Sequence, residues 1–298
     1  MADMDGIKTN NHEGIDPSKN FHTDTAPGKT NYHIKGMDNM SWGMKDRMSR
    51  IFNPKSGNAL ILAVDHGYIS GATKGLERLD ILLPELQEDI DVVMATRGAI
   101  RTCLPPMFNK PIALRCSAGS TVLSDDVTSE TIGVDIEDVI RMNASAMAVQ
   151  TFLGTEDEKE TITNLCRTID LGVKYGIPTL GVVAVGKQMA RSPQFFSLAT
   201  RVLAELGAQI VKTYYCEDFE KVTSGCPVPI VVAGENSCRQ KKRLLWPTEQ
   251  SVKVPAVWIW EEIFSRQKIR RLWQRLLLKS FMKIIRIMKP TNFIWIQR

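Results

Sequence analysis

The sequence lacks the features that mark membrane, secreted and metal-binding proteins. No run of about 18 or more uncharged apolar residues occurs in the 298 residues, so no transmembrane span is predicted. The first residues, MADMDGIKTNNHEG, contain no apolar stretch of the kind found in secretory signals. The six cysteines have no CxxC spacing and only four histidines are present. These absences predict a cytoplasmic protein with reduced thiols, no metal site and no membrane partner.

Charge is distributed unevenly along the chain. Of the 38 Lys and Arg residues 15 lie after Glu235, whereas only 3 of the 33 Asp and Glu residues do. The formal charge of +5 therefore combines −7 on residues 1–235 with +12 on residues 236–298. Five of the six tryptophans also lie in this tail. Such an abrupt change in composition indicates either a foreign domain or a segment that did not evolve as a protein sequence.

The hydrophobic pattern divides the chain into a polar arm (1–40), an α/β domain (41–235) and the basic tail (236–298). Within the α/β domain, short and mostly continuous apolar runs are typical of parallel strands buried on both faces. The predicted strands are Ala59–His66, Val92–Arg97, Ile112–Cys116, Ala146–Leu153, Thr179–Val185, Gln209–Tyr215 and Val228–Gly234.

Amphipathic segments separate these strands. Glu156–Tyr175 has helical spacing, an expected capping box of Thr155 with Glu158, and Gly176 as its stop. Phe195–Leu206 is similar. Seven strands with no GxGxxG after the first favour a TIM (β/α)8 barrel over a Rossmann fold. An eighth strand should follow.

Lys212 is the first candidate for chemistry. It lies in the apolar segment GAQIVKTYY, near the C-terminal end of a predicted strand, where TIM barrels place their active sites. Loss of hydration there disfavours the ammonium form, and a neutral amine can attack a ketone to form an imine. The alternative is a lysine that extends out of the barrel or pairs with a carboxylate.

Polar residues and glycines at other strand ends are weaker candidates. Asp65 ends the first strand, where it could pair with Lys212 or shuttle a proton, or else cap a helix or loop. Arg97 could meet a substrate anion or form a surface ion pair. Ala233 and Gly234 end the seventh strand, where backbone N–H groups commonly bind phosphate, although glycine is also frequent in ordinary turns.

Four segments carry a family resemblance: RIFNPKSGNALILAVDHGYISG, MATRGAI, RSPQFFSLATRVLAELGAQIVKTYY and GCPVPIVVAG. Together they resemble the DeoC/FbaB class I aldolase family, and within it a thiolase branch. The resemblance extends from about Met1 to Gly234. It implies a cytoplasmic homodecamer of TIM barrels with no resident cofactor.

The activity that the resemblance implies is an acetyl transfer. The phosphorylated diketone 3-hydroxy-5-phosphonooxypentane-2,4-dione would be cleaved with coenzyme A to acetyl-CoA and dihydroxyacetone phosphate, in autoinducer-2 degradation. Lys212 would be the Schiff-base lysine and Asp65 the carboxylate at the barrel rim. Aldolases of the family place a tyrosine acid after the fifth strand, but here that stretch reads VVAVGKQM, which fits the thiolase branch better.

Two other functions remain open at this point. A Schiff-base phosphosugar aldolase would share the fold and Lys212 but would not need coenzyme A. A basic-tailed protein that binds nucleic acid or membranes is the alternative from another class, because IRRLWQRLLLKSFMKIIRIMK has the composition of a basic amphipathic helix. No base-reading or anchoring motif accompanies this charge, so we expect neither a nucleic acid nor a membrane as partner.

The tail departs from the family after Gly234, and the genetic code suggests why. Tryptophan has the single codon TGG, so a frame that starts one base earlier must read Trp258–Ile259 as Asp, Trp260–Glu261 as Gly and Trp246–Pro247 as Ala. With permitted codon choices, KVPAVWIWEEIFSR becomes GASGVDMGRNIFQ, an eighth strand with the Gly-Arg-Asn phosphate motif of the family. We therefore interpret 236–298 as out-of-frame translation, and the chain as the product of a damaged gene or of a sequencing error.

Loss of the in-frame eighth strand has structural consequences. It would leave two barrel edges unpaired and remove half of the phosphate site. We accordingly expect the translated chain to fold poorly and to have impaired activity.

The hypothesis predicts a slipped base near the codon for Gly234. Sequencing the gene across that codon should reveal a homopolymer run and, one base out of register, an open frame that continues the barrel. An intact frame without such a run would contradict the hypothesis.

Overall fold

The computed structural model describes residues 32–297 apart from residue 74 and the segments 186–190, 234–255 and 261–292. The chain forms two units, Met1–Asn31 and Tyr32–Arg298, and the description below concerns the second. Among the described residues, no helix combines the length and the apolar character that a membrane crossing needs.

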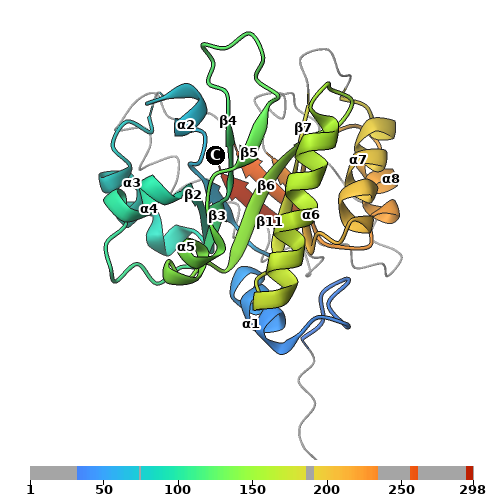
Figure 1. Ribbon diagram of the computed structural model, residues 1–298. Coiled ribbons are helices and arrows are strands. Elements are labelled where there is room, and N and C mark those ends of the chain that lie inside the picture. Colours follow the sequence, from blue (N-terminus) through green and yellow to red (C-terminus); the bar gives the residue numbers. More distant parts are fainter. Residues whose placement is uncertain (1–31, 74, 186–190, 234–255, 261–292, 298) are drawn as a thin grey trace, which may run out of the picture. The chain divides into compact units, whose positions relative to one another are not determined.

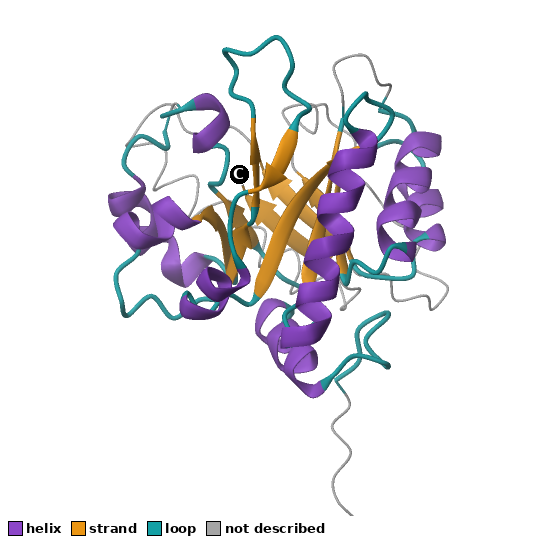
Figure 2. Ribbon diagram, in the orientation of Figure 1, coloured by secondary structure: helices purple, strands orange, loops and turns teal. Residues whose placement is uncertain are grey.

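Parallel strands form a closed barrel in the order β1-β11-β10-β9-β8-β7-β6-β3-β2 (Figures 1 and 2). The seven predicted strands are all present, and the predicted barrel class is confirmed. Their bounds are β1 (Ile61–Ala63), β2 (Val92–Thr96), β3 (Ile112–Arg115), β6 (Ala146–Phe152), β7 (Thr179–Ala184), β8 (Ile210–Tyr214) and β9 (Ile230–Ala233).

The tail closes the barrel, contrary to the expectation of unpaired edges. β10 (Ala256–Trp260) pairs with β9, where an eighth strand belongs, and β11 (Phe293–Gln297) pairs with both β10 and β1. All these pairings are parallel. The predicted edges are therefore satisfied by backbone pairing with two segments of the tail.

Helices flank the strands, with α3, α4 and α5 in one group and α6, α7 and α8 in another (Figure 1). The helices are α1 (Trp42–Ile51), α2 (Gly67–Ser70), α3 (Leu79–Leu86), the 3-10 helix η2 (Gln87–Asp89), α4 (Arg97–Cys103), α5 (Ile136–Arg141), α6 (Glu158–Tyr175), α7 (Pro193–Glu205) and α8 (Phe219–Gly225).

The ends of α6 test the predicted capping. The C-terminal stop is confirmed, because Gly176 adopts a left-handed conformation with φ 69°. The capping box is wrong: the helix begins at Glu158, with Asp157 at the N-cap position. The Glu158 carboxylate instead accepts a hydrogen bond from the Gly154 N–H at 2.6 Å, and the Thr155 hydroxyl donates to the Phe152 carbonyl. Both side chains thus stabilise the turn before the helix.

Alternation along the strands separates two apolar cores. One set of side chains points into the barrel, and there α1 adds Met48 and Ile51. The other set packs outward against the surrounding helices. The inward set includes Ile61, Ala63, Ala113, Ala148, Leu180, Ile210 and Val231. Any residue two positions after one of these along the same strand also faces the interior.

An antiparallel hairpin that the sequence did not predict lies between β3 and α5. It consists of β4 (Ser117–Gly119) and β5 (Glu130–Ile132), and its connecting loop extends beyond the barrel strands (Figure 2). A Cβ atom at Gly119 would lie 2.0 Å from the carbonyl oxygen of Ser129. The two strands can therefore approach this closely only with glycine at position 119.

A similarly close contact in α6 generates a prediction about stability. A Cβ atom on Gly172 would lie 2.4 Å from the Ile177 carbonyl oxygen, so Gly172→Ala should destabilise the protein by about 1 to 3 kcal/mol. Gly98→Ala is the control, because nothing lies within 4 Å of its Cβ position in α4. We expect that substitution to stabilise by about 0.4 to 1 kcal/mol. Denaturant unfolding measures both, and equal effects of the two would contradict the contact.

Candidate active site

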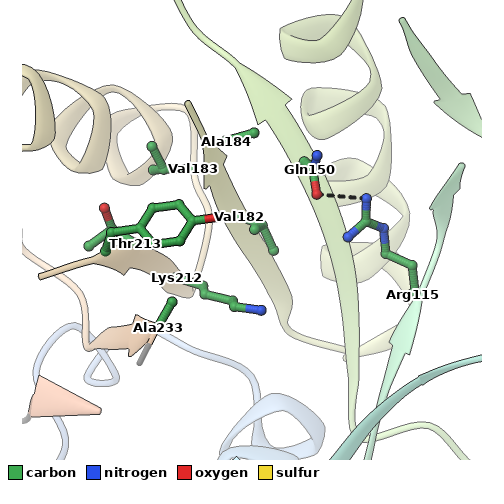
Figure 3. Close-up of a pocket in the computed structure, with 9 residues that line it drawn as sticks. Arg115, Gln150, Val182, Val183, Ala184, Lys212, Thr213 and Ala233 are labelled. Carbon is green, nitrogen blue, oxygen red and sulfur yellow. Dashed lines mark hydrogen bonds between the residues drawn. The ribbon is translucent and has the colours of Figure 1, made fainter. Parts of the chain in front are cut away.

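A pocket opens at the C-terminal ends of the barrel strands, where TIM-barrel enzymes place their catalytic residues. It is lined by Arg115, Gln150, Val182, Val183, Ala184, Lys212, Thr213, Tyr214 and Ala233. Figure 3 shows Lys212 and Arg115 entering it from different sides, with their nitrogen-bearing ends pointing toward one another. The pocket thus brings together β3, β6, β7, β8 and β9.

Lys212 is buried, with 5% of its surface exposed. It follows inward-facing Ile210 by two positions, and so its side chain enters the barrel. Its Nζ lies 3.8 Å from the Met94 sulfur on β2. A buried amine in a pocket is the arrangement that imine chemistry needs, and its location agrees with the prediction from the sequence.

Asp65 lies just beyond β1 and is 1% exposed. The structure records a partner that the sequence did not predict: Arg115 Nη1 donates to Asp65 Oδ2 at 3.0 Å. Asp65 does not cap the short helix α2, whose N-cap position belongs to His66. The carboxylate therefore enters the site as half of a buried ion pair.

Arg115, the last residue of β3, is the centre of a buried polar cluster. Its Nη2 lies 2.7 and 2.9 Å from the two carboxylate oxygens of Glu130 and 2.9 Å from Gln150 Oε1. Its Nε donates to the Ser117 carbonyl at 2.9 Å. The Tyr68 hydroxyl donates to Glu130 Oε1 at 2.6 Å and also contacts Nη2. The β4–β5 hairpin thus supplies Glu130 as a second carboxylate for one guanidinium.

The electrostatics of this cluster keep the Arg115 guanidinium charged and the Tyr68 phenol neutral. Burial opposes the charge on Arg115, but the carboxylates of Glu130 and Asp65 outweigh it and raise the pKa of the guanidinium above its ordinary value. Burial also raises the pKa of the Tyr68 phenol, which Arg115 only partly offsets. Tyr68 therefore remains a neutral donor, and the Arg115 guanidinium stays charged beside the carboxylates of Asp65 and Glu130.

The remaining predicted residues have separate outcomes. Ala233 ends β9, is buried and lines the pocket. Gly234 lies outside the described residues, so the phosphate role of this pair stays a prediction. Arg97 forms an ion pair with Asp138 at 3.2 Å, as the surface alternative predicted.

Arg115, Gln150, Tyr68 and Glu130 were missed in the sequence. A usable signal existed for the first two, because each follows an inward-facing alanine by two positions near the end of an apolar strand. None existed for Glu130, which belongs to an unpredicted hairpin, or for Tyr68, which lies on the short helix α2.

Cys116 lies next to Arg115 but is not a nucleophile. Burial raises the pKa of its thiol to about 12, although Arg115 lowers it somewhat, and its Sγ contacts the Leu114 carbonyl. A thiol with this pKa is protonated at neutral pH and unreactive. Within the part of the chain that the structure describes, no cluster of three or more His, Cys, Asp or Glu side chains could hold a metal ion.

Comparison with known families assigns the chain to a protein family. The sequence model of the family described as "DeoC/LacD family aldolase" matches residues 59–245, which include every strand from β1 to β9. The chain belongs to this family. The match includes Lys212 and ends near the start of the basic tail.

Relatives of known name are similar over most of the chain. A 3-hydroxy-5-phosphonooxypentane-2,4-dione thiolase from Enterobacter sp. (strain 638) is 48% identical over 235 residues, covering 78% of this chain and 77% of the relative. A protein of the same name from Escherichia coli O139:H28 is 45% identical over 245 residues, covering 82% and 81%. An uncharacterized aldolase from Pasteurella multocida is 44% identical, with the same coverage.

Solved structures share the fold at low sequence identity. An archaeal fructose-1,6-bisphosphate aldolase is 21% identical with a TM-score of 0.59, covering 86% of this chain and 91% of that one. A Schiff base-forming fructose-1,6-bisphosphate aldolase is 19% identical with the same TM-score, covering 85% and 91%. These similarities support the barrel fold.

The raised thiol pKa generates a prediction about labelling. At pH 8, iodoacetamide should modify the partly exposed Cys103 and Cys166 of the native protein well before Cys116. The Cys116 thiol lacks the thiolate form until the pH approaches 12, and it is also buried. Peptide mass spectrometry over time measures the order, and unfolding in urea should remove the difference. Early modification of native Cys116 would contradict the assignment.

Proposed function

We propose that this chain catalyses acetyl transfer from 3-hydroxy-5-phosphonooxypentane-2,4-dione to coenzyme A, giving acetyl-CoA and dihydroxyacetone phosphate. The observation that carries the proposal is the buried amine of Lys212 in the pocket at the barrel mouth. The names of relatives 45 to 48% identical support the substrate and the acceptor. Coenzyme A is a co-substrate here, and the reaction needs no resident cofactor.

The chemistry follows from an imine at Lys212. The amine attacks the ketone next to the phosphate-bearing carbon; the adduct takes up one proton from solvent and loses water, which leaves a protonated imine. The thiolate of coenzyme A then attacks the acetyl carbonyl, and the bond between that carbon and the hydroxyl-bearing carbon breaks. Its electron pair moves into the imine, which becomes an enamine. Protonation of the enamine carbon and hydrolysis by water release dihydroxyacetone phosphate and restore the amine.

Residues around Lys212 have separate parts in this scheme. The apolar walls formed by Val182 and Ala184 keep water from the amine. Asp65 would transfer or hold a proton at the rim, since Arg115 fixes its carboxylate there. We assign the phosphate to the backbone at Ala233 and Gly234, because loops after the seventh strand of such barrels commonly bind it.

A phosphosugar aldolase is the second candidate, since one relative with 44% identity is named an aldolase. It would use Lys212 in the same way but would cleave without coenzyme A. Cleavage of the diketone only in the presence of coenzyme A would support the thiolase, and cleavage without it would support the aldolase. Salt-dependent binding to nucleic acid or anionic vesicles would instead support the function based on the basic tail.

We infer that residues 41–235 form the catalytic domain and that residues 236–298 are out-of-frame sequence. The family match ends at residue 245, and the charge changes sign ten residues earlier, after Glu235. We also infer a homo-oligomer, a decamer by family resemblance, in the cytoplasm.

Lys212→Arg should abolish the reaction. Arginine keeps a positive charge but cannot form an imine, so turnover should fall by about 10⁴-fold or more, as for other residues that form the covalent intermediate. Borohydride reduction with dihydroxyacetone phosphate should add mass to the peptide containing Lys212 in the unmodified chain and not in the variant. The surface substitution Lys221→Arg is the matched control, because Lys221 pairs with Asp218 on α8. Turnover retained by Lys212→Arg would refute the mechanism.

A further inference from the structure

Gln150 brings an amide group into the pocket from β6. It follows Ala148 by two positions, and because Ala148 faces the barrel interior, the side chain of Gln150 points inward as well. Its Oε1 accepts a hydrogen bond from Arg115 Nη2 at 2.9 Å. A guanidinium contains donors and no acceptor. This contact therefore fixes the orientation of the amide, with its oxygen facing Arg115 and its nitrogen turned away.

The nitrogen of this amide is open to a ligand. Among the residues that the structure describes, none accepts a hydrogen bond from Gln150 Nε2. Gln150 is half-buried and lines the pocket, and Figure 3 shows the nitrogen on the side of the amide nearer the C-terminal end of β6. The hydrogen bond from Arg115 polarises the amide, which strengthens its N–H groups as donors.

The strand register places this donor level with Lys212. Gln150 pairs with Val182 on β7, and Val182 pairs in turn with Lys212 on β8. The backbones of Gln150 and Lys212 are therefore about 10 Å apart, two strand spacings, and both side chains extend into the barrel. Val182 between them has no hydrogen-bonding group on its side chain. A substrate joined to Lys212 thus meets Gln150 as the donor on the β6 side of the pocket.

The direction of the proposed substrate follows from the same strand order. Its phosphate is assigned to the backbone at Ala233 and Gly234, after β9, and β8 with Lys212 lies between β9 and the pair β7 and β6. The hydroxyl-bearing carbon and the acetyl group then extend toward β7 and β6. The acetyl carbonyl must also be reachable from the C-terminal end of the barrel, because coenzyme A enters from there.

We propose that Gln150 is a catalytic residue whose Nε2 donates a hydrogen bond to the acetyl carbonyl oxygen of the substrate. When the thiolate adds to this carbonyl, the new C–S bond moves an electron pair onto the oxygen, and the resulting oxyanion binds the donor more strongly than the carbonyl did. Cleavage of the bond to the hydroxyl-bearing carbon restores the carbonyl in acetyl-CoA. The inference rests on the proposed function, and Arg115 is a positioning residue in it.

The test compares two reactions of the full chain. Cleavage of the diketone with coenzyme A passes through the oxyanion, whereas borohydride trapping of dihydroxyacetone phosphate on Lys212 uses a ketone without an acetyl group. Gln150→Glu keeps an oxygen to accept from Arg115 but removes the N–H donors. Its kcat for cleavage should fall about 100- to 1000-fold, as for other single oxyanion donors, with a smaller change in KM. Its trapping should remain close to that of the unmodified chain.

A second variant remains informative if the charge of glutamate disturbs the fold or the amine. Gln150→Met is neutral and similar in length, lacks the donor, and should show the same loss of cleavage with retained trapping. Gln87→Glu is the matched control, because Gln87 lies on η2 and contacts Asn109 at the surface. It should cleave and trap like the unmodified chain. Melting temperatures show which variants are folded.

The outcomes separate this inference from the proposed function. If the unmodified chain does not cleave the diketone with coenzyme A, both are overturned. If it does, and a folded Gln150 variant cleaves equally fast, Gln150 is not the donor and the proposed function stands. If the folded variants lose trapping in proportion to cleavage, Gln150 acts at the imine or the phosphate, and its assignment to the acetyl carbonyl is overturned.

Discussion

Alternation of side chains around a closed parallel barrel is the constraint on which the site depends. Because successive residues face opposite sides of a strand, the residue two positions after an inward-facing alanine or isoleucine also faces inward. Lys212, Arg115 and Gln150 all enter the pocket by this rule, from β8, β3 and β6. A one-residue slip in any of these strands would turn its polar side chain toward the helices.

The strands were predictable from the sequence because buried parallel strands have continuous apolar runs. Lys212 was predictable for the same reason, as a charged residue inside such a run. The cap of α6 was not, because Thr155 and Glu158 have the right spacing for a capping box and yet bond to the turn before the helix. Short-range patterns do not distinguish these two uses of the same side chains.

Glu130 could not be predicted because its role depends on contacts distant in sequence. The carboxylate meets a guanidinium 15 residues earlier and a phenol 62 residues earlier. Its strand is three residues long and lacks an apolar run. Only the fold brings the hairpin against the barrel mouth, where Gly119 allows the two hairpin strands to approach.

The pairing of β10 with β9 shows how little a strand position demands of the residues that occupy it. Backbone N–H and C=O groups form the ladder, and β-branched and aromatic residues suit it in almost any order. The segment AVWIW, which consists of alanine, β-branched and aromatic residues, meets that requirement. A strand position therefore tolerates a change of sequence far better than a ligand site does, because hydrogen bonds between main chains do not depend on the identity of the side chains.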